Sequence, residues 1–511
     1  MNEPTPSKPT HDEQSDKNLD QLLERINALT NGNSPPSPDS LPPIPAMPSD
    51  SQAEYATEPN APKKPSMEDV QAYVVESQGL ATSEQQHHEI LNDQFVPRSP
   101  STFGDAKISP ALAEELILKF LLSRGEASGR QISQQIRLPF ILISGFLNTL
   151  KNEQLITYAG PATMNDYACR LTENGVNRAY TYSKICTYFG STPVVLQDYI
   201  RSVKAQTIEG QYPTRDQLKN AFSDLLIDDK MLDRLGPAIS SGRGMFLHGF
   251  PGNGKTSIAE RITKSFGPYI WIPRALYIDG EIMRLYDPTV HEELPLQSNA
   301  GVVDTKEVDH RWVRIKRPTI VVGGELNMEH LEITFNQSCG ISEAPVQLKS
   351  NCGILVIDDF CRQKMRVEEL LNRWIVPLEK RYDYLNLSSG KKVQLPFDQL
   401  VVFSTNLEPR DLVDDAFMRR IPYKIEVKNP SLEMFHQLFQ IMARNLDIPF
   451  EQDMFDYMID TYYRPVDRQL RNCHPRDLLL QILNYCRFNQ IPTAMTKDSV
   501  DFAIDSYFSV M

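Results

Sequence analysis

The 511-residue chain lacks any run of about 20 apolar residues, the length a membrane helix needs. Its N-terminus is charged and proline-rich, unlike a secretory signal. The seven cysteines form no Cys-x-x-Cys pair and show no histidine spacing typical of a metal site. These absences exclude a disulfide framework and a structural zinc site, so we expect a cytoplasmic protein with reduced thiols and no membrane insertion.

Aromatic residues are scarce in the first 105 residues, which hold 15 of the 37 prolines. This segment carries 17 acidic and 6 basic residues, and so accounts for most of the net charge of −13. Such a composition is typical of disorder, so we predict a disordered, acidic, proline-rich tail over residues 1–105. Two islands, 19–29 and 67–80, contain apolar residues at helical spacing. A partner-docking helix and a transient helix in a solvated tail both fit them.

The segment 106–186 has the pattern of three helices, a hairpin and a last helix. Ser109-Pro110 supplies a helix cap and a first-turn proline. This order resembles a winged-helix domain. Its third helix is apolar, with Lys151 as its only cation and Asn148 as its only side-chain amide suited to a base edge, which favours protein docking over DNA binding. The predicted elements are helices at 109–123, 130–137 and 139–151, strands at 155–158 and 167–171, and a helix from 172.

An apolar run, Met245 to Leu247, leads into residues 249–256, whose sequence Gly-Phe-Pro-Gly-Asn-Gly-Lys-Thr fits G-x-x-x-x-G-K-[ST]. In such a loop, glycines let backbone N–H groups close around phosphate oxygens, the lysine reaches the outer phosphates, and the hydroxyl ligates Mg²⁺. The pattern predicts a strand, a phosphate loop and a helix. The expected ATP-binding residues are Gly249, Pro251, Gly252, Asn253, Gly254, Lys255, Thr256 and Ser257, with Thr256 also binding Mg²⁺.

Two further apolar runs end in polar side chains. Residues 353–357 are followed by Asp358 and Asp359, and residues 399–405 are followed by Asn406. Buried parallel strands read as apolar runs, and open α/β sheets bind ligands at the carboxyl ends of their strands. We expect Asp358 to bind Mg²⁺, Asp359 to orient or deprotonate the attacking water, and Asn406 to bridge that water and the terminal phosphate.

From residue 187 onward the chain resembles the AAA+ ATPases. The loop is similar to Walker A, the two acids to Walker B and Asn406 to sensor 1. The resemblance implies an ATP- and Mg²⁺-binding core over residues 187–427, with a parallel sheet flanked by helices. Residues 416–421 resemble the segment that carries the arginine finger. This implies that Arg419 or Arg420 reaches the nucleotide of a neighbouring subunit in a homo-oligomeric ring, usually a hexamer.

After Pro430 apolar residues recur at helical spacing, and the resemblance implies a helical lid domain over residues 428–511. His474-Pro475 opens one lid helix. Arg476, in its first turn, resembles sensor 2, a cation that touches the γ-phosphate within the same subunit and couples the lid angle to the nucleotide state. A surface ion pair between Arg476 and Asp477 also fits this sequence.

Two insertions indicate which subgroup of the AAA+ ATPases the chain resembles. An amphipathic helix at 367–381 precedes alternating residues at 384–387 and 392–395 around a Ser-Ser-Gly turn, which predicts a hairpin similar to the pre-sensor-1 insertion. Residues 325–341 are similar in order to the helix 2 insertion of the MoxR-like group. The MoxR-like resemblance implies a chaperone that remodels a protein client, bound through the tail or the winged helix.

One position departs from the family, because the second Walker B acid is usually Glu and is Asp359 here. Its side chain is shorter by one methylene, so it reaches about 1.5 Å less far. A rearranged active site, slow hydrolysis and a nucleotide-dependent scaffold all fit this change, and we favour slow ATP hydrolysis. An ATP-responsive regulator that binds DNA through the winged helix is the alternative function.

Overall fold

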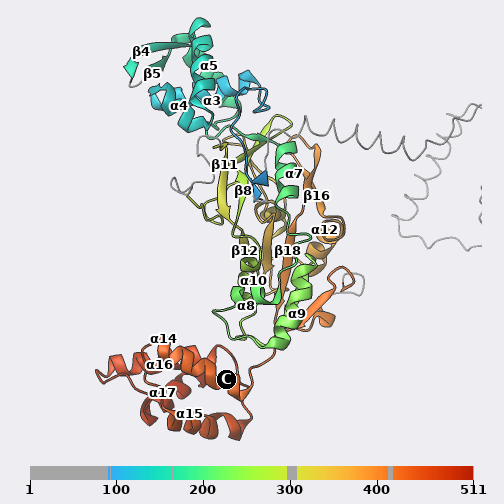
Figure 1. Ribbon diagram of the computed structural model, residues 1–511, viewed down its shortest axis with the longest axis vertical. Coiled ribbons are helices and arrows are strands. Elements are labelled where there is room, and N and C mark those ends of the chain that lie inside the picture. The colour runs from blue at the N-terminus through green and yellow to red at the C-terminus, as the bar shows by residue number, and fades with distance from the viewer. Residues whose placement is uncertain (1–89, 92–93, 163–165, 296–307, 413–417, 510–511) are drawn as a thin grey trace, which may run out of the picture. The chain divides into compact units, whose positions relative to one another are not determined.

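The computed structural model describes residues 90–91, 94–162, 166–295, 308–412 and 418–509 (Figure 1). These residues belong to one unit, Glu76–Met511. The predicted islands at 19–29 and 67–80 lie outside them, as do nearly all residues of the predicted tail up to residue 93. Among the helices of the described part, none has the length and apolar character that crossing a membrane requires.

Residues 94–105, which the sequence assigned to the tail, pack against the rest of the protein. Strand β1 (Ile90–Leu91) pairs with β2 (Gln94–Phe95), and the buried ring of Phe95 lies 5.6 Å from that of Trp312. The N–H of Asp309 donates to the carbonyl of Pro97 at 3.0 Å. The packed chain therefore begins before residue 105. Composition did not indicate this, because one buried aromatic residue, Phe95, changes the average composition of a polar stretch very little.

The helices and hairpin predicted between residues 109 and 185 are confirmed, and one three-residue strand, too short to give a periodic pattern, adds to them. The strand order in the antiparallel sheet is β3-β5-β4. The elements are α3 (Pro110–Arg124), β3 (Glu126–Ser128), α4 (Gly129–Ile136), α5 (Phe140–Asn152), β4 (Ile156–Ala162), β5 (Asp166–Leu171) and α6 (Glu173–Ile185).

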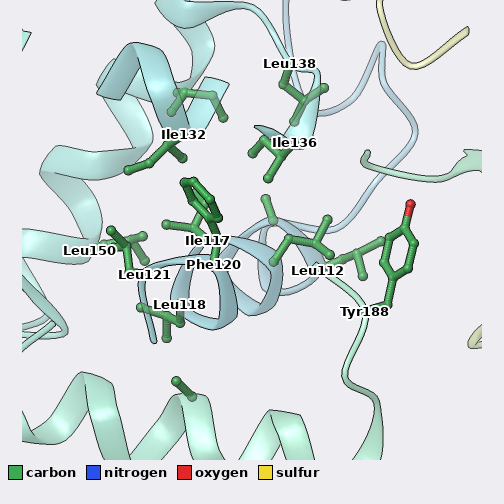
Figure 2. Close-up of a cluster of buried hydrophobic side chains, with 14 of the residues drawn as sticks. Leu112, Ile117, Leu118, Phe120, Leu121, Ile132, Ile136, Leu138, Leu150 and Tyr188 are labelled. Carbon is green, nitrogen blue, oxygen red and sulfur yellow. The ribbon is translucent and has the colours of Figure 1, made fainter. Parts of the chain in front are cut away.

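Helix caps and a shared apolar core stabilise these elements. Ser109 and Thr172 cap α3 and α6 by accepting the N–H of Leu112 and Gly175, as N-terminal caps do. Burying apolar side chains between the three helices stabilises the packing. Figure 2 shows the side chains that meet there, which come from α3 (Leu112, Ile117, Leu118, Phe120, Leu121), from α4 (Ile132, Ile136) and from α5 (Leu150), with Leu138 and Tyr188.

The central sheet is parallel throughout. Its strand order is β12-β15-β18-β7-β19, so the strand before the phosphate loop lies between β18 and the last strand. Every residue of β15 and β18 is buried, which explains why both read as continuous apolar runs. The strands are β7 (Met245–His248), β12 (Thr319–Val322), β15 (Gly353–Ile357), β18 (Gln399–Thr405) and β19 (Tyr423–Glu426).

Helices cover both faces of this sheet (Figure 1). Successive side chains of a strand point to opposite faces, so Met245 and Leu247 pack with α9 (Asp229–Ser240) and α10 (Lys255–Ile262), whereas Phe246 packs with α12 (Val367–Lys380). Before α9 lie α7 (Leu196–Ala205) and α8 (Arg215–Ala221). The predicted fold class, an α/β core with a parallel sheet flanked by helices, is confirmed.

A second five-stranded sheet, which the sequence did not predict, lies mostly in the stretch between α10 and β15. Its order is β13-β14-β10-β9-β6. The predicted helix 2 insertion, 325–341, holds only the short 3-10 helix η3 (Met328–Leu331) and β13. The strands are β6 (Val194–Val195), β9 (Ala275–Ile278), β10 (Glu281–Arg284), β13 (Thr334–Asn336) and β14 (Ile341–Glu343), and β8 (Tyr269–Pro273) pairs separately with β11 (Trp312–Lys316).

The predicted hairpin is confirmed as β16 (Tyr382–Asn386) paired antiparallel with β17 (Lys392–Pro396). Its turn is held to β10 by the carboxylate of Glu281. That carboxylate accepts the N–H and hydroxyl of Ser388, at 3.2 and 2.8 Å, and the N–H of Ser389 at 3.1 Å. Hydrogen bonds to the charged form lower the pKa of Glu281 against the effect of its desolvation.

The C-terminal region is helical, as predicted. His474 is buried there between the rings of Phe435, Tyr463 and Phe508, and its Nδ1 is hydrogen-bonded to the Tyr463 hydroxyl at 3.0 Å. The helices are α14 (Leu432–Asn445), α15 (Gln452–Met458), the π-helical turn η5 (Ile459–Tyr463), the 3-10 turn η6 (Arg464–Val466), α16 (His474–Phe488) and α17 (Lys497–Phe508).

Acid is expected to weaken this helical region through His474. Burial is the main cause that lowers the pKa of His474 from 6.5 to about 4. The charges of Arg471 and Arg468 contribute to this lowering, and Asp477 raises the pKa by less. Because the folded protein binds this proton more weakly than the unfolded chain, the stabilisation is present above pH 6.5 and is lost as pH falls toward 4. Between pH 7 and 5 it amounts to about 1–2 kcal/mol.

Urea unfolding of the C-terminal helical region at pH 7 and pH 5 measures this effect. His474→Asn is expected to remove that part of the pH dependence. The exposed His330 supplies a matched control, because His330→Asn is expected to leave the dependence unchanged. Equal pH dependence in His474→Asn and the wild type would contradict the interpretation.

Candidate nucleotide site

The predicted phosphate loop lies at the carboxyl end of β7 and leads directly into α10. Gly249 has a φ of 139°, and a side chain there would collide with the backbone of Val427. Gly254 begins α10 with a φ of 83°, a conformation that residues with side chains rarely adopt. The glycines therefore shape a loop whose backbone N–H groups and helix N-terminus suit an anion.

Lys255 is buried and is held inside this loop. Its ammonium donates to the carbonyl of Gly249 at 2.9 Å, to that of Phe250 at 3.1 Å and to Oδ1 of Asn406 at 2.7 Å. The pKa of Lys255 is lowered by desolvation, which is only partly offset by the nearby carboxylates of Asp358 and Asp359. The structure thus brings together the loop lysine, both predicted acids and Asn406.

The side chains expected to bind Mg²⁺ are already in contact. The hydroxyl of Thr256 donates to Oδ2 of Asp358 at 2.9 Å. Within the described part of the chain, no group of three or more His, Cys, Asp or Glu side chains could hold a metal ion alone. Mg²⁺ fits such a pair, because it prefers oxygen ligands and is usually held by one or two protein groups together with waters and substrate phosphates.

Asp359 is exposed and has a left-handed backbone, with a φ of 46°. Its Oδ1 accepts the side-chain N–H of Asn406 at 3.2 Å, and the Gln363 side chain donates to its carbonyl at 3.2 Å. Asp adopts left-handed φ values more readily than longer side chains do, because its short carboxylate bonds locally. The turn after β15 therefore gives a physical reason for Asp at this position rather than the longer Glu.

A cavity of about 550 Å³ adjoins the loop, within the range typical of ligand pockets. All the predicted nucleotide-binding residues except Gly249 line it. Apolar residues line it as well, and the sequence analysis did not predict their part in the site; an apolar triplet before the helix cap Asp228 was one available signal. The apolar lining includes Leu225, Leu226, Ile227, Met231, Ile258, Val427, Pro430, Met434, Leu438 and Met442.

Arg476 lines the same cavity from the first turn of α16. It is exposed, and its guanidinium donates to the adjacent Asp477 at 3.0 Å. The position of Arg476 is therefore compatible with both interpretations of the sequence. It forms the surface ion pair with Asp477, and it lines the cavity as a sensor 2 arginine would.

Arg419 and Arg420 lie in a different place, although Ala416 and Phe417 of the same predicted segment fall outside the described residues. Both arginines line a separate cavity of about 480 Å³ together with Arg243, Leu378, Glu379 and Lys380. Arg243 precedes β7, whereas the phosphate loop follows it, so a strand length of roughly 13 Å separates the two cavities. The arginines are not brought to the loop of their own chain.

The fold and these contacts define the class. A phosphate-loop sequence at the carboxyl end of a parallel sheet, followed by a helical C-terminal region, is the α/β architecture that the sequence predicted. A family model described as a domain of unknown function (DUF8689) matches residues 431–506. The search of curated proteins found no match.

Solved structures with partial similarity include two RuvB structures and a magnesium chelatase model. A mutant of RuvB from Thermotoga maritima is 12% identical with a TM-score of 0.34, covering 56% of this chain and 71% of its own. RuvB from the same organism, described as a Holliday junction branch migration motor, is 14% identical with a TM-score of 0.32, covering 57% and 73%.

A model of the magnesium chelatase subunits BchI and BchD is 15% identical with a TM-score of 0.29, covering 55% of this chain and 92% of that one. At such TM-scores none of these similarities bears on the activity of this chain, so its function is inferred below from its own residues.

Lengthening the side chain at position 359 is expected to strain the turn. Asp359→Glu should destabilise the protein by about 1 kcal/mol, because Glu tolerates the left-handed conformation poorly. Asp359→Asn is the matched control, since Asn tolerates it as Asp does. Urea unfolding of the three proteins checks this, and equal stability of the Glu variant and the wild type would show that the turn imposes no such constraint.

Proposed function

We propose that this protein binds ATP with Mg²⁺ and hydrolyses it slowly, as an AAA+ ring ATPase that remodels a protein partner. The observation that carries the proposal is the linked set of contacts from Lys255 through Asn406 to Asp359, beside the contact between Thr256 and Asp358. Few arrangements other than a phosphate site place a buried lysine, a metal-suited pair and an exposed acid around a glycine loop.

The cavity supports ATP as the ligand. Its polar lining would offer the loop N–H groups and Lys255 to phosphates, and its apolar lining suits the faces of a purine base. Thr256 and Asp358 would hold Mg²⁺, which supplies charge neutralisation at the phosphates. Lys255 now donates to two loop carbonyls, and phosphate oxygens would replace these as its partners.

Asp359 would orient or deprotonate the attacking water. Its exposure and its hydrogen bond to Asn406 support this role, because Asn406 also contacts Lys255 and so fixes the acid relative to the loop. Arg476 would approach the γ-phosphate from α16, since it lines the cavity and its side chain is 63% exposed. In this view α14–α17 form the lid.

Between the two candidate fingers, we propose Arg419. Arg420 pairs with Glu379 at 2.8 Å and has a side chain 23% exposed, whereas Arg419 is exposed. Their distance from the loop of the same chain supports action on a neighbouring subunit, as in a head-to-tail ring, for which a hexamer is the expected form. The cations Arg243 and Lys380 line the same cavity and would favour the approach of phosphates.

The winged-helix-like segment, 106–186, would select a protein client, alone or with the N-terminal tail. Two features of α5 support protein docking over DNA. Ile141 is 86% exposed, and the one cation predicted for this helix, Lys151, lies over the ring of Tyr158 at 4.2 Å. An apolar contact surface with its cation turned onto an aromatic ring fits a protein better than a phosphate backbone.

Two substitutions separate binding from hydrolysis. Lys255→Ala is expected to weaken ATP binding by at least 100-fold, because the phosphates lose their buried cation, whereas Asp359→Asn is expected to bind ATP normally and release phosphate at least tenfold more slowly. Equilibrium binding of a fluorescent ATP analogue and a phosphate-release assay measure these effects. Tight ATP binding by the wild type without phosphate release would instead identify a nucleotide-dependent scaffold.

Mixing variants tests the action of Arg419 between subunits. Lys255→Ala and Arg419→Ala are each expected to be inactive alone, but an equal mixture regains activity at interfaces that pair an intact loop with an intact arginine. Random assembly gives about a quarter of the wild-type rate, because each head-to-tail interface combines one loop with one arginine. A mixture with Arg420→Ala instead of Arg419→Ala is the control. Absence of any recovery would contradict the proposed role of Arg419.

A further inference from the structure

Asn253 occupies a position that the phosphate-loop pattern leaves open, between Gly252 and Gly254. Its side chain is nevertheless almost fully buried, with 1% of the residue exposed. A buried amide without partners is costly, so its contacts indicate what the loop depends on. The hydrogen bonds of its side chain to Asn429 and Asn472 lead out of the loop toward the C-terminal helical region.

The partners of Asn253 are two other amide side chains. Its Nδ2 donates to Oδ1 of Asn429 at 2.7 Å. The backbone N–H of Asn472 donates to Oδ1 of Asn253 at 3.4 Å, and Nδ2 of Asn472 donates to the backbone carbonyl of Asn253 at 3.1 Å. Asn429 in turn donates to Oε1 of Gln469 at 3.1 Å. We call Asn253, Asn429 and Asn472 the amide clamp.

The amide clamp joins three segments whose relative positions would change if the lid opened. Asn253 belongs to the phosphate loop, Asn429 to the connection between β19 and α14, and Asn472 to the segment that leads into α16. Next to it, Gly252 packs so closely on Cys473 that a side chain at Gly252 would collide with its sulfur. The loop and the segment before Arg476 are therefore in direct contact.

We propose that Asn253 is a positioning residue that couples the phosphate loop to the lid. The amide clamp orients the peptide groups on either side of Asn253, and their N–H groups belong to the set that faces the phosphates. When the segment containing Asn472 withdraws, the buried amide of Asn253 loses partners and the loop loses its phosphate-ready shape. Lid docking and phosphate binding thus stabilise each other.

This inference rests on the proposed nucleotide site, but one part of it is independent of ATP. Without the amide clamp the loop itself should open more often. Hydrogen exchange of residues 249–256 in the nucleotide-free protein measures this directly. Asn472→Ala is expected to raise exchange in the loop about tenfold, because it removes the bond to the Asn253 carbonyl. Asn489→Ala is the matched control, since Asn489 is exposed at the far end of α16.

ATP binding gives the second readout. Asn472→Ala and Asn429→Ala are each expected to weaken ATP binding about five- to tenfold, with a larger effect on KM than on kcat. In a double-mutant cycle, Asn429→Ala should have little further effect once Asn253 is Ala, because both substitutions remove the hydrogen bond between these two side chains. A purely structural effect would lower the stability of each variant and leave KM unchanged.

The outcomes distinguish coupling by the amide clamp from ATP binding at the proposed site. Loop exchange equal to that of the wild type in Asn472→Ala would overturn the coupling by the amide clamp, whatever the affinity for ATP. Faster loop exchange in a protein that does not bind ATP would support the clamp and overturn the proposed function. Faster exchange together with non-additive loss of ATP binding would support both.

Discussion

The buried ammonium of Lys255 is the interaction on which the site depends. Removing a charge from water costs free energy unless hydrogen bonds replace its hydration. Here two loop carbonyls and Asn406 supply these bonds. Asp358 and Asp359 favour the charged form of the lysine. These groups come from β7, β15 and β18, three neighbouring strands whose carboxyl ends meet at one edge. The parallel order of the sheet therefore places the lysine among its partners.

The same sheet explains how the site is held rigid. Its two faces are filled by different helices, and the alternation of side chains along each strand packs both faces at once. A catalytic constellation on such a scaffold keeps its geometry better than one on loops alone. What remains adjustable is the contact with the C-terminal helical region, where Arg476 is exposed and the amide clamp meets the loop.

The sequence predicted much of this architecture because its signals are local. Apolar runs marked β15 and β18, the Ser-Ser-Gly turn marked the β16–β17 hairpin, and a helix cap marked α3. It failed where signals were short or diluted: the second five-stranded sheet is built of strands of two to four residues, and Phe95 anchors a segment that composition assigned to the tail. Short strands carry too few residues to display a period.

The sequence by itself determined the chemical groups available, since the glycine loop, Lys255, the paired acids and Asn406 stand in recognisable order. Only the tertiary structure decided which of them meet. The bond between Lys255 and Asn406 spans 151 residues and that between Asn253 and Asn472 spans 219. Likewise, the left-handed turn at Asp359 and the place of Arg419 at a separate cavity became visible only in the folded chain. Contacts between residues so far apart depend on how the whole chain folds, which local patterns do not specify.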